Sequence, residues 1–214
     1  MNRPVLHIGN KQLSSWSLRP WLALRKAGIA FDEHMIPLDR PESRAALEAA
    51  SPGGTVPVLQ TGGVAIWDSL AICEWAAEHN AALWPSDPGV RGQARSVTAA
   101  MHSGFSALRN ACPMDLGRPA APITLDEAVR KDVAAIQAIW AAVRRSADGP
   151  FLFGRWSIAD AFYTPVAARF HHFAITLDAA SQAYCDVLLA DEDYRDWFDA
   201  AQREVLLLPG SSDA

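Results

Sequence analysis

The sequence changes its hydrophobic pattern once, and this change limits the folds that the chain can adopt. Residues 4 to 84 alternate short β-rich runs with apolar residues at helical spacing. After a cluster of turn residues at positions 85 to 89, apolar residues recur at helical spacing only. An alternating segment followed by a helical one predicts an α/β domain over residues 1–84 joined to an all-α domain over residues 85–214.

The first segment predicts the element order βαβαββα. Its strands are expected at residues 5–8, 31–38, 56–59 and 64–66, and its helices at residues 17–27, at 42–50 and from residue 70 onward. A first helix that starts near residues 15 to 17 places Pro20 in its first turn, where a missing N–H removes no hydrogen bond. Asp68 or Ser69 suits the N-cap of the last helix.

The second segment predicts helices over residues 90–110, 124–147 and 158–173, with a weaker pair between 179 and 205. Thr124 with Glu127 three positions later has the spacing of a capping box. Residues 209–214 have the composition of a frayed tail. Strands are not evident in this segment, so we expect the second domain to be helical throughout.

Composition excludes several classes of protein. The formal charge is −5 and no basic run occurs, which argues against a nucleic-acid partner. No stretch approaches the roughly 18 consecutive apolar residues that a membrane-spanning helix needs. The apolar stretch that follows the N-terminus is too short for a secretion signal, so we expect a cytoplasmic protein.

The sequence indicates neither a disulfide framework nor a metal site. Its three cysteines, Cys73, Cys112 and Cys185, are widely spaced and form no Cys-x-x-Cys pair, so reduced thiols are expected. His171 and His172 are adjacent, and neighbouring residues of a helix point in different directions. We therefore assign no metal.

Two groups of residues could carry chemistry. Ser14, Ser15 and Ser17 lie where the first strand leads into the first helix, and free N–H groups with hydroxyls at a helix N-terminus favour an anion. One of these serines is also expected simply to cap the helix. A cis peptide before Pro57 would expose the backbone of Val56 to an extended ligand, although an edge-strand proline explains the same residues.

Four motifs follow one another along the chain: Ser14-Ser15-Trp16-Ser17-Leu18-Arg19-Pro20-Trp21, Val56-Pro57-Val58-Leu59, Asp68-Ser69-Leu70-Ala71-Ile72, and Phe151-Leu152-Phe153-Gly154 leading into Ser157-Ile158-Ala159-Asp160-Ala161. Their order and spacing resemble a cytosolic glutathione transferase of the zeta class and its zeta-like bacterial branch, the family of maleylacetoacetate isomerase. The resemblance covers residues 4 to 205. The last motif resembles the family's capping box, in which Ser157 and Asp160 satisfy backbone N–H groups reciprocally.

The resemblance implies a thioredoxin-like N-terminal domain that binds glutathione and an all-helical domain that completes a pocket for a second substrate. Its glutathione-binding positions are Trp16, Thr55, Val56, Pro57, Asp68 and Ser69. It assigns activation of the glutathione thiol to the hydroxyl of Ser14, with Ser15 as the alternative. A hydroxyl donor at a helix N-terminus can lower the thiol pKa from its free value of about 8.5, so that thiolate attacks an electrophile.

The second-substrate pocket is expected to involve residues spaced along the helix predicted over 90–110. Met101, His102, Phe105 and Arg109 could share one face of that helix, and the surrounding sequence resembles a signature of the bacterial branch. Equally, Met101 and Phe105 could belong to the core, with His102 satisfied by a neighbour.

Three departures from the zeta pattern shape the expected reaction. Trp16 replaces the usual cysteine, which disfavours thiol transfer by the protein itself, and Thr55 stands where relatives place Lys, Arg or Gln near the glycyl end of glutathione. Trp21 replaces a second arginine and is expected to make one wall of the pocket more apolar, which disfavours anionic substrates.

The expected function is therefore a homodimeric, detoxification-type glutathione transferase that adds the thiolate to small electrophiles or isomerises an unsaturated acid. Glutathione-dependent peroxide reduction and a non-catalytic scaffold that binds glutathione or hydrophobic ligands are the alternatives.

Overall fold

A four-stranded mixed sheet forms the N-terminal part of the computed structural model, which describes residues 3–38, 40, 43–145 and 147–204. The strand order is β2-β1-β3-β4. Strand β1 (Val5–Ile8) pairs in parallel with β2 (Asp32–Met35) and antiparallel with β3 (Val58–Thr61), and β3 pairs antiparallel with β4 (Val64–Trp67). The predicted order βαβαββα is confirmed.

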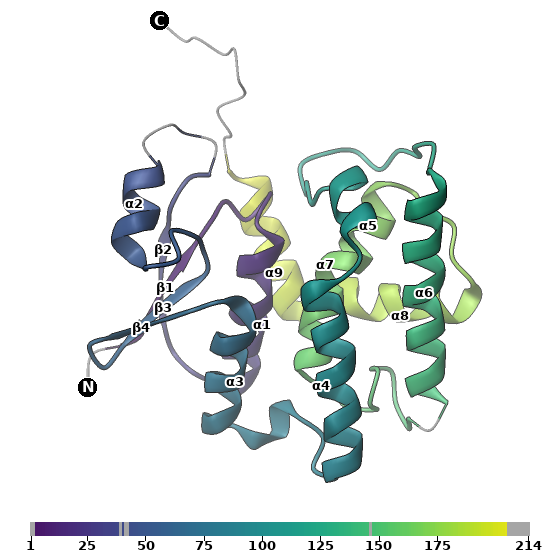
Figure 1. The fold of residues 1–214 in the computed structure, drawn as a ribbon, viewed down its shortest axis with the longest axis horizontal. Helices are drawn as coiled ribbons and strands as arrows, with labels where there is room; N and C mark the ends of the chain where they lie inside the picture. Colours follow the sequence, from purple (N-terminus) through teal and green to yellow (C-terminus); the bar gives the residue numbers. More distant parts are fainter. Residues whose placement is uncertain (1–2, 39, 41–42, 146, 205–214) are drawn as a thin grey trace, which may run out of the picture.

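Helices cover both faces of this sheet (Figure 1). Helices α1 (Ser15–Ala27) and α3 (Ser69–His79) pack together on the face toward the helical domain. Helix α2 (Ser43–Ala50) packs on the opposite face, where Ile36, Ala50 and Val58 form a small separate core. The alternation of side chains along β1 explains this division, because Leu6 and Ile8 are fully buried in the main core.

The C-terminal part is helical, as predicted. It follows the 3-10 turn η1 (Ala81–Leu83) and contains α4 (Pro88–Ser103), α5 (Ser106–Ala111), α6 (Glu127–Arg144), α7 (Ile158–His172), α8 (Ala179–Ala190) and α9 (Glu192–Gln202). Helix α7 is buried over nearly its whole length and packs against α1, α4 and α8. The boundary at residues 84 and 85 stays a prediction, and residues 209–214 lie outside the described part of the chain.

Two predicted helices differ from the structure at their ends. The helix predicted over residues 90–110 is interrupted, because α4 ends at Gly104 and Phe105 has the left-handed φ of 57° before α5 begins. The helix predicted from Thr124 begins at Glu127, since Asp126 rather than Thr124 caps it by accepting from the backbone N–H of Val129 at 2.8 Å.

Pro20 lies further inside its helix than predicted. Helix α1 begins at Ser15, so Pro20 is in the second turn, where its missing N–H leaves the carbonyl of Trp16 without the usual helical partner. Extensive burial of α1 against α3 and α7 offsets this lost hydrogen bond. The tertiary packing of α1 therefore overrides its local sequence preference.

The capping box that the sequence predicts at the start of α7 is confirmed. The carboxylate of Asp160 is completely buried and accepts four hydrogen bonds, from the backbone N–H groups of Leu152 and Ser157 at 3.1 and 2.8 Å and from the hydroxyls of Ser157 and Tyr184 at 2.9 and 2.8 Å. Burial raises the pKa of Asp160 to about 6, while these donors favour its ionised form. Asp160 thus joins the start of α7, the preceding loop and α8.

We expect Asp160→Ala to lower the free energy of unfolding by about 3 kcal/mol, because it leaves several buried donors without an acceptor. The measurement is urea unfolding followed by circular dichroism. Asp178→Ala is the matched control: Asp178 caps α8 at a solvent-exposed site, and its loss should cost about 1 kcal/mol. Equal losses for the two variants would contradict the importance of burial.

Candidate functional site

Ser14 is the N-cap of α1, as the capping interpretation predicts. Its Oγ accepts from the backbone N–H of Ser17 at 3.2 Å and lies 2.7 Å from the Oγ of Ser17, which in turn accepts from the N–H of Gly9 at 3.1 Å. Either hydroxyl of such a pair can donate to the other. When Ser17 donates, the proton of Ser14 is free for a ligand at the positive end of the helix dipole.

Ser15 makes a different contact, with the C-terminal domain. Its Oγ accepts from Nη2 of Arg169 at 3.1 Å, across 154 positions of sequence. Both residues are buried, with 5% of Ser15 and 4% of Arg169 exposed. The two serines that the sequence could not rank therefore differ in their surroundings: Ser14 is bound within its own domain and Ser15 is bound to α7.

Trp16 gathers cationic and aromatic side chains from both domains. The guanidinium carbons of Arg19 and Arg109 lie 4.2 and 5.0 Å from the centre of its ring, and the ring of His102 meets it edge-on at 5.3 Å. Trp16, His102 and Arg109 are partly exposed, whereas Arg19 is fully buried. The accessible part of this cluster is thus an indole flanked by an arginine and a histidine.

Arg19 is a buried cation without a carboxylate partner among the residues that the structure describes. Its guanidinium also lies 4.6 Å from the ring centre of Phe162, and none of its three nitrogens has a hydrogen-bond partner in the described chain. Burial, followed by repulsion from Arg169 and Arg109, lowers the pKa of Arg19 to about 9. Arg19 therefore remains charged at neutral pH, and its charge is offset only in part by the two aromatic rings.

The peptide bond between Val56 and Pro57 is cis. Val56 lies two residues before β3 and outside its ladder, and its side chain is partly exposed. Thr55 is exposed, and Arg44, which could have supplied a cation nearby, pairs with Glu48 on the surface of α2 at 2.9 Å. The residues at 55 to 57 thus present backbone groups rather than charge.

Asp68 and Ser69 begin α3 as predicted. Asp68 has a φ of 75°, and its Oδ1 caps the helix by accepting from the N–H of Leu70 at 2.7 Å. Its Oδ2 lies 3.1 Å from Nε2 of His102 on α4. The hydroxyl of Ser69 is buried and has no partner among the described residues, which suits an acceptor brought by a ligand.

The four residues predicted for the second-substrate pocket do not share one face, because the break at Gly104 separates them. Met101 is completely buried in the core, which agrees with the second of the two interpretations that the sequence left open. Phe105 packs against the core at the break. Of the four, only His102 and Arg109 contact Trp16. The imidazole of His102 also contacts the carboxylate of Asp68.

The expectation about Trp21 is also wrong. This side chain is 4% exposed, packs against Trp197 at 5.4 Å and donates from Nε1 to Glu33 at 2.6 Å. It therefore belongs to the packing between α1 and α9 and contributes nothing to the surface around Trp16. The sequence analysis missed Arg169, although a single arginine within the apolar run at 158–173 was an available signal.

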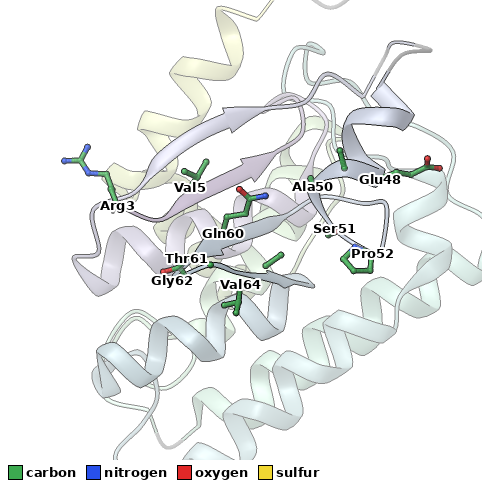
Figure 2. A pocket seen from close by; sticks show the side chains of 13 residues that line it. Arg3, Val5, Glu48, Ala50, Ser51, Pro52, Gln60, Thr61, Gly62 and Val64 are labelled. Carbon is green, nitrogen blue, oxygen red and sulfur yellow. The ribbon is translucent and has the colours of Figure 1, made fainter. Parts of the chain in front are cut away.

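Figure 2 shows a groove elsewhere on the N-terminal domain, over the face of the sheet that carries α2. Its lining includes Arg3, Val5, Glu48, Ala50, Ser51, Pro52, Gln60, Thr61, Gly62 and Val64. None of the predicted site residues lines this groove. Within the described ranges, the structure contains no group of three or more His, Cys, Asp or Glu that could hold a metal, and no helix long and apolar enough to cross a membrane.

Comparisons with known proteins agree with this architecture. Residues 13–79 match the family model for the glutathione S-transferase N-terminal domain. A structure of a glutathione transferase homolog from Burkholderia, with bound glutathione, is 22% identical, covers 94% of this chain and 99% of its own, and has a TM-score of 0.71. Glutathione transferase Omega 1C from Trametes versicolor has the same identity and TM-score, covering 94% and 92%. The chain thus has the glutathione transferase fold.

The relatives identified by sequence match parts of this chain. A probable maleylacetoacetate isomerase of Caenorhabditis elegans is 31% identical over 110 residues, which is 50% of each chain. Protein IN2-1 homolog A of Oryza sativa is 27% identical over 154 residues, covering 71% of this chain and 59% of the rice protein. The matched segment therefore spans half or little more of the length of these two relatives.

We expect the imidazole of His102 to titrate below its ordinary pKa. Desolvation and repulsion by Arg19 and Arg109 lower the pKa of His102 and outweigh the carboxylate of Asp68, which raises it. Neutral His102 consequently stabilises the fold above its unfolded pKa, and this contribution is lost as the pH falls through the folded pKa. Titration by NMR measures the value.

In Asp68→Asn the same titration should move to still lower pH, because the carboxylate that favours the imidazolium is gone. A pKa of His102 above its ordinary value in the unsubstituted protein would show that the pairing with Asp68 outweighs burial.

Proposed function

We propose that this chain is a glutathione transferase, with Ser14 as the group that activates the glutathione thiol. The observation that carries the proposal is the start of α1, where the capping hydroxyl of Ser14 lies at the positive end of the helix dipole and the buried Arg19 has no hydrogen-bond partner in the described chain. Each of these favours an anion, and a thiolate is an anion that glutathione can form there. The family match over residues 13–79 and the glutathione bound to the Burkholderia homolog support the same ligand.

The remaining contacts to glutathione follow from the start of β3 and of α3. The backbone of Val56 would pair with the cysteinyl part of the peptide, and Trp16 and Thr55 would flank it. The hydroxyl of Ser69, which has no partner among the described residues, would bind the γ-glutamyl carboxylate at the positive end of the α3 dipole. Asp68 would bind the ammonium group, in competition with His102.

The reaction is then addition of sulfur to an electrophilic carbon. The thiol releases its proton to solvent, and the thiolate accepts a hydrogen bond from Ser14 until it attacks. A new sulfur–carbon bond forms, and the electron pair leaves with a leaving group or moves into a conjugated carbonyl. Stabilising thiolate before the encounter raises the fraction of reactive glutathione at neutral pH.

We expect Ser14→Ala to bind glutathione but to raise the pH at which its thiol is half-ionised by about one to two pH units, since one charge-assisted hydrogen bond is lost. Calorimetry measures binding and ultraviolet absorbance measures bound thiolate. Ser96→Ala, an exposed serine of α4, is the control. An unchanged midpoint in Ser14→Ala would remove Ser14 from the mechanism. Absence of glutathione binding by the unsubstituted protein would favour a scaffold for hydrophobic ligands.

The surface around Trp16 favours an electrophile that carries a negative charge. The apolar wall expected from Trp21 is not there. The guanidinium of the partly exposed Arg109 lies 5.0 Å from the centre of the Trp16 ring, and that of the buried Arg19 lies at 4.2 Å. The carboxylate of Asp132 raises the pKa of Arg109, but it accepts its hydrogen bond from the backbone N–H of Leu108, at 2.9 Å. Unsaturated acids of the kind that maleylacetoacetate isomerases act on are consistent with this charge.

We expect 4-chloro-3-nitrobenzoate to be preferred over 4-chloro-3-nitrobenzamide by about tenfold in kcat/KM, after division by the uncatalysed rates, because one charge pair near a partly buried arginine is worth about 1 to 2 kcal/mol. Arg109→Gln should abolish most of this preference, whereas Arg195→Gln on the exposed side of α9 should keep it. A preference for the amide in the unsubstituted protein would contradict a cationic pocket.

Peroxide reduction would use the same thiolate. An assay with an organic hydroperoxide distinguishes this reaction from addition to electrophiles. A scaffold would bind glutathione without turnover of either class of substrate. The homodimer and the cytoplasmic location both stay predictions from the sequence.

A further inference from the structure

Arg169 is the buried charged residue that the proposed mechanism does not yet use. It lies on α7, is 4% exposed, and donates a hydrogen bond from each of its three side-chain nitrogens to an oxygen atom. Nε donates to the carbonyl of Cys112 at 2.9 Å and Nη1 to the carbonyl of Pro165 at 3.2 Å. These two bonds fix the guanidinium so that its third nitrogen, Nη2, meets the hydroxyl of Ser15.

This contact leaves the proton of Ser15 without an acceptor among the described residues. A serine hydroxyl has one proton and two lone pairs, and Arg169 occupies a lone pair. A cationic donor on the oxygen polarises the O–H bond and makes it a stronger donor to an anion. Ser15 is also the first residue of α1, so that donor lies at the positive end of the helix dipole.

The charged groups around this pair are mostly cationic, and neither Arg169 nor Arg19 forms an ion pair with a carboxylate in the described chain. Burial and repulsion by Arg109 lower the pKa of Arg169 to about 10, so it stays charged at neutral pH. Arg19 lies one helical turn after Ser15 and is also buried, but unlike Arg169 it has no hydrogen-bond partner among the residues that the structure describes. Burying two such cations is unfavourable unless an anion joins them.

The other titratable groups near this pair come from four elements. Arg109 on α5, Cys112 after it and Arg118 in the following loop lie toward Arg169. Cys73 and Asp68, in and before α3, act on Arg19, and His102 of α4 meets Trp16. Burial raises the pKa of both cysteines, which keeps them protonated, and Asp68 is the one carboxylate in this set.

We propose that Arg169 is a positioning residue that, through Ser15, makes this hydroxyl a second donor to the glutathione thiolate. The role of glutathione rests on the proposed function above. Ser14 then supplies a donor from the N-terminal domain, and Ser15 supplies one whose strength is set by α7. The pKa of the glutathione thiol thus depends on the contact between α7 of the helical domain and the start of α1.

The test measures the pH of half-ionisation of bound glutathione in Arg169→Met, Arg169→Lys, Ser15→Ala and the double variant Ser15→Ala/Arg169→Met. Each single loss, Arg169→Met or Ser15→Ala, should raise the midpoint by about one pH unit. The double variant should raise it no further than the larger single change, because Arg169 acts through Ser15. Arg169→Lys should recover part of the shift, and Arg195→Met is the surface control.

A cysteine at position 14 tests the same inference without glutathione. In Ser14→Cys the pH dependence of alkylation by iodoacetamide reports the thiol pKa beside Ser15, and the buried Cys73, Cys112 and Cys185 set the background, measured in the unsubstituted protein. Adding Arg169→Met or Ser15→Ala should move this midpoint upward as well.

The two readouts separate the inference from the proposed function. If glutathione does not bind but the midpoint of the introduced cysteine rises in both variants, the role of Arg169 stands and the transferase assignment fails. If glutathione binds as thiolate and neither variant moves either midpoint, the role of Arg169 is overturned. Additive shifts in the double variant would also overturn it, since Arg169 would then act without Ser15. If Arg169→Met does not fold, Ser15→Ala and Arg169→Lys decide the question alone.

Discussion

The packing of α1 between two domains is the constraint on which the rest of this structure depends. One side of the helix lies with α3 over the sheet, and another meets α7 and α9 of the helical domain. Nine of the ten positions from Ser15 to Leu24 are buried, and Trp16 is the exception. Because the helix has almost no solvent face, its polar residues must find partners inside the protein or in a ligand.

This burial explains the chemistry at the start of α1. The hydroxyls of Ser14 and Ser17 are hydrogen-bonded to each other within the N-terminal domain, and the hydroxyl of Ser15 accepts a hydrogen bond from Arg169 of the other domain. Arg19 has aromatic rings and no hydrogen-bond acceptor among the described residues. Cations buried at a helix N-terminus stabilise whatever negative charge arrives there, so the cost in folding free energy becomes an advantage in binding an anion.

Local signals predicted the elements well, and distant contacts corrected the details. The capping box at Ser157 and Asp160 and the cap at Asp68 depend on residues close in sequence, so they could be recognised. The break at Gly104 could not, because periodicity continues across it and only the backbone shows that Phe105 leaves the helix. The burial of Met101 was one of two interpretations left open, and the burial of Trp21 was not predicted because its partner Trp197 is 176 positions away.

The sequence by itself determined the order of elements, the division into an α/β part and a helical part, and the residue types at the start of α1 and α3, since these follow from periodicity and from caps a few residues long. Only the tertiary structure decided which of these residues meet. Arg169 reaches Ser15 and His102 reaches Asp68 because the helical domain packs on α1 and α3. Such contacts depend on the direction of side chains across an interface, which spacing along one segment does not encode.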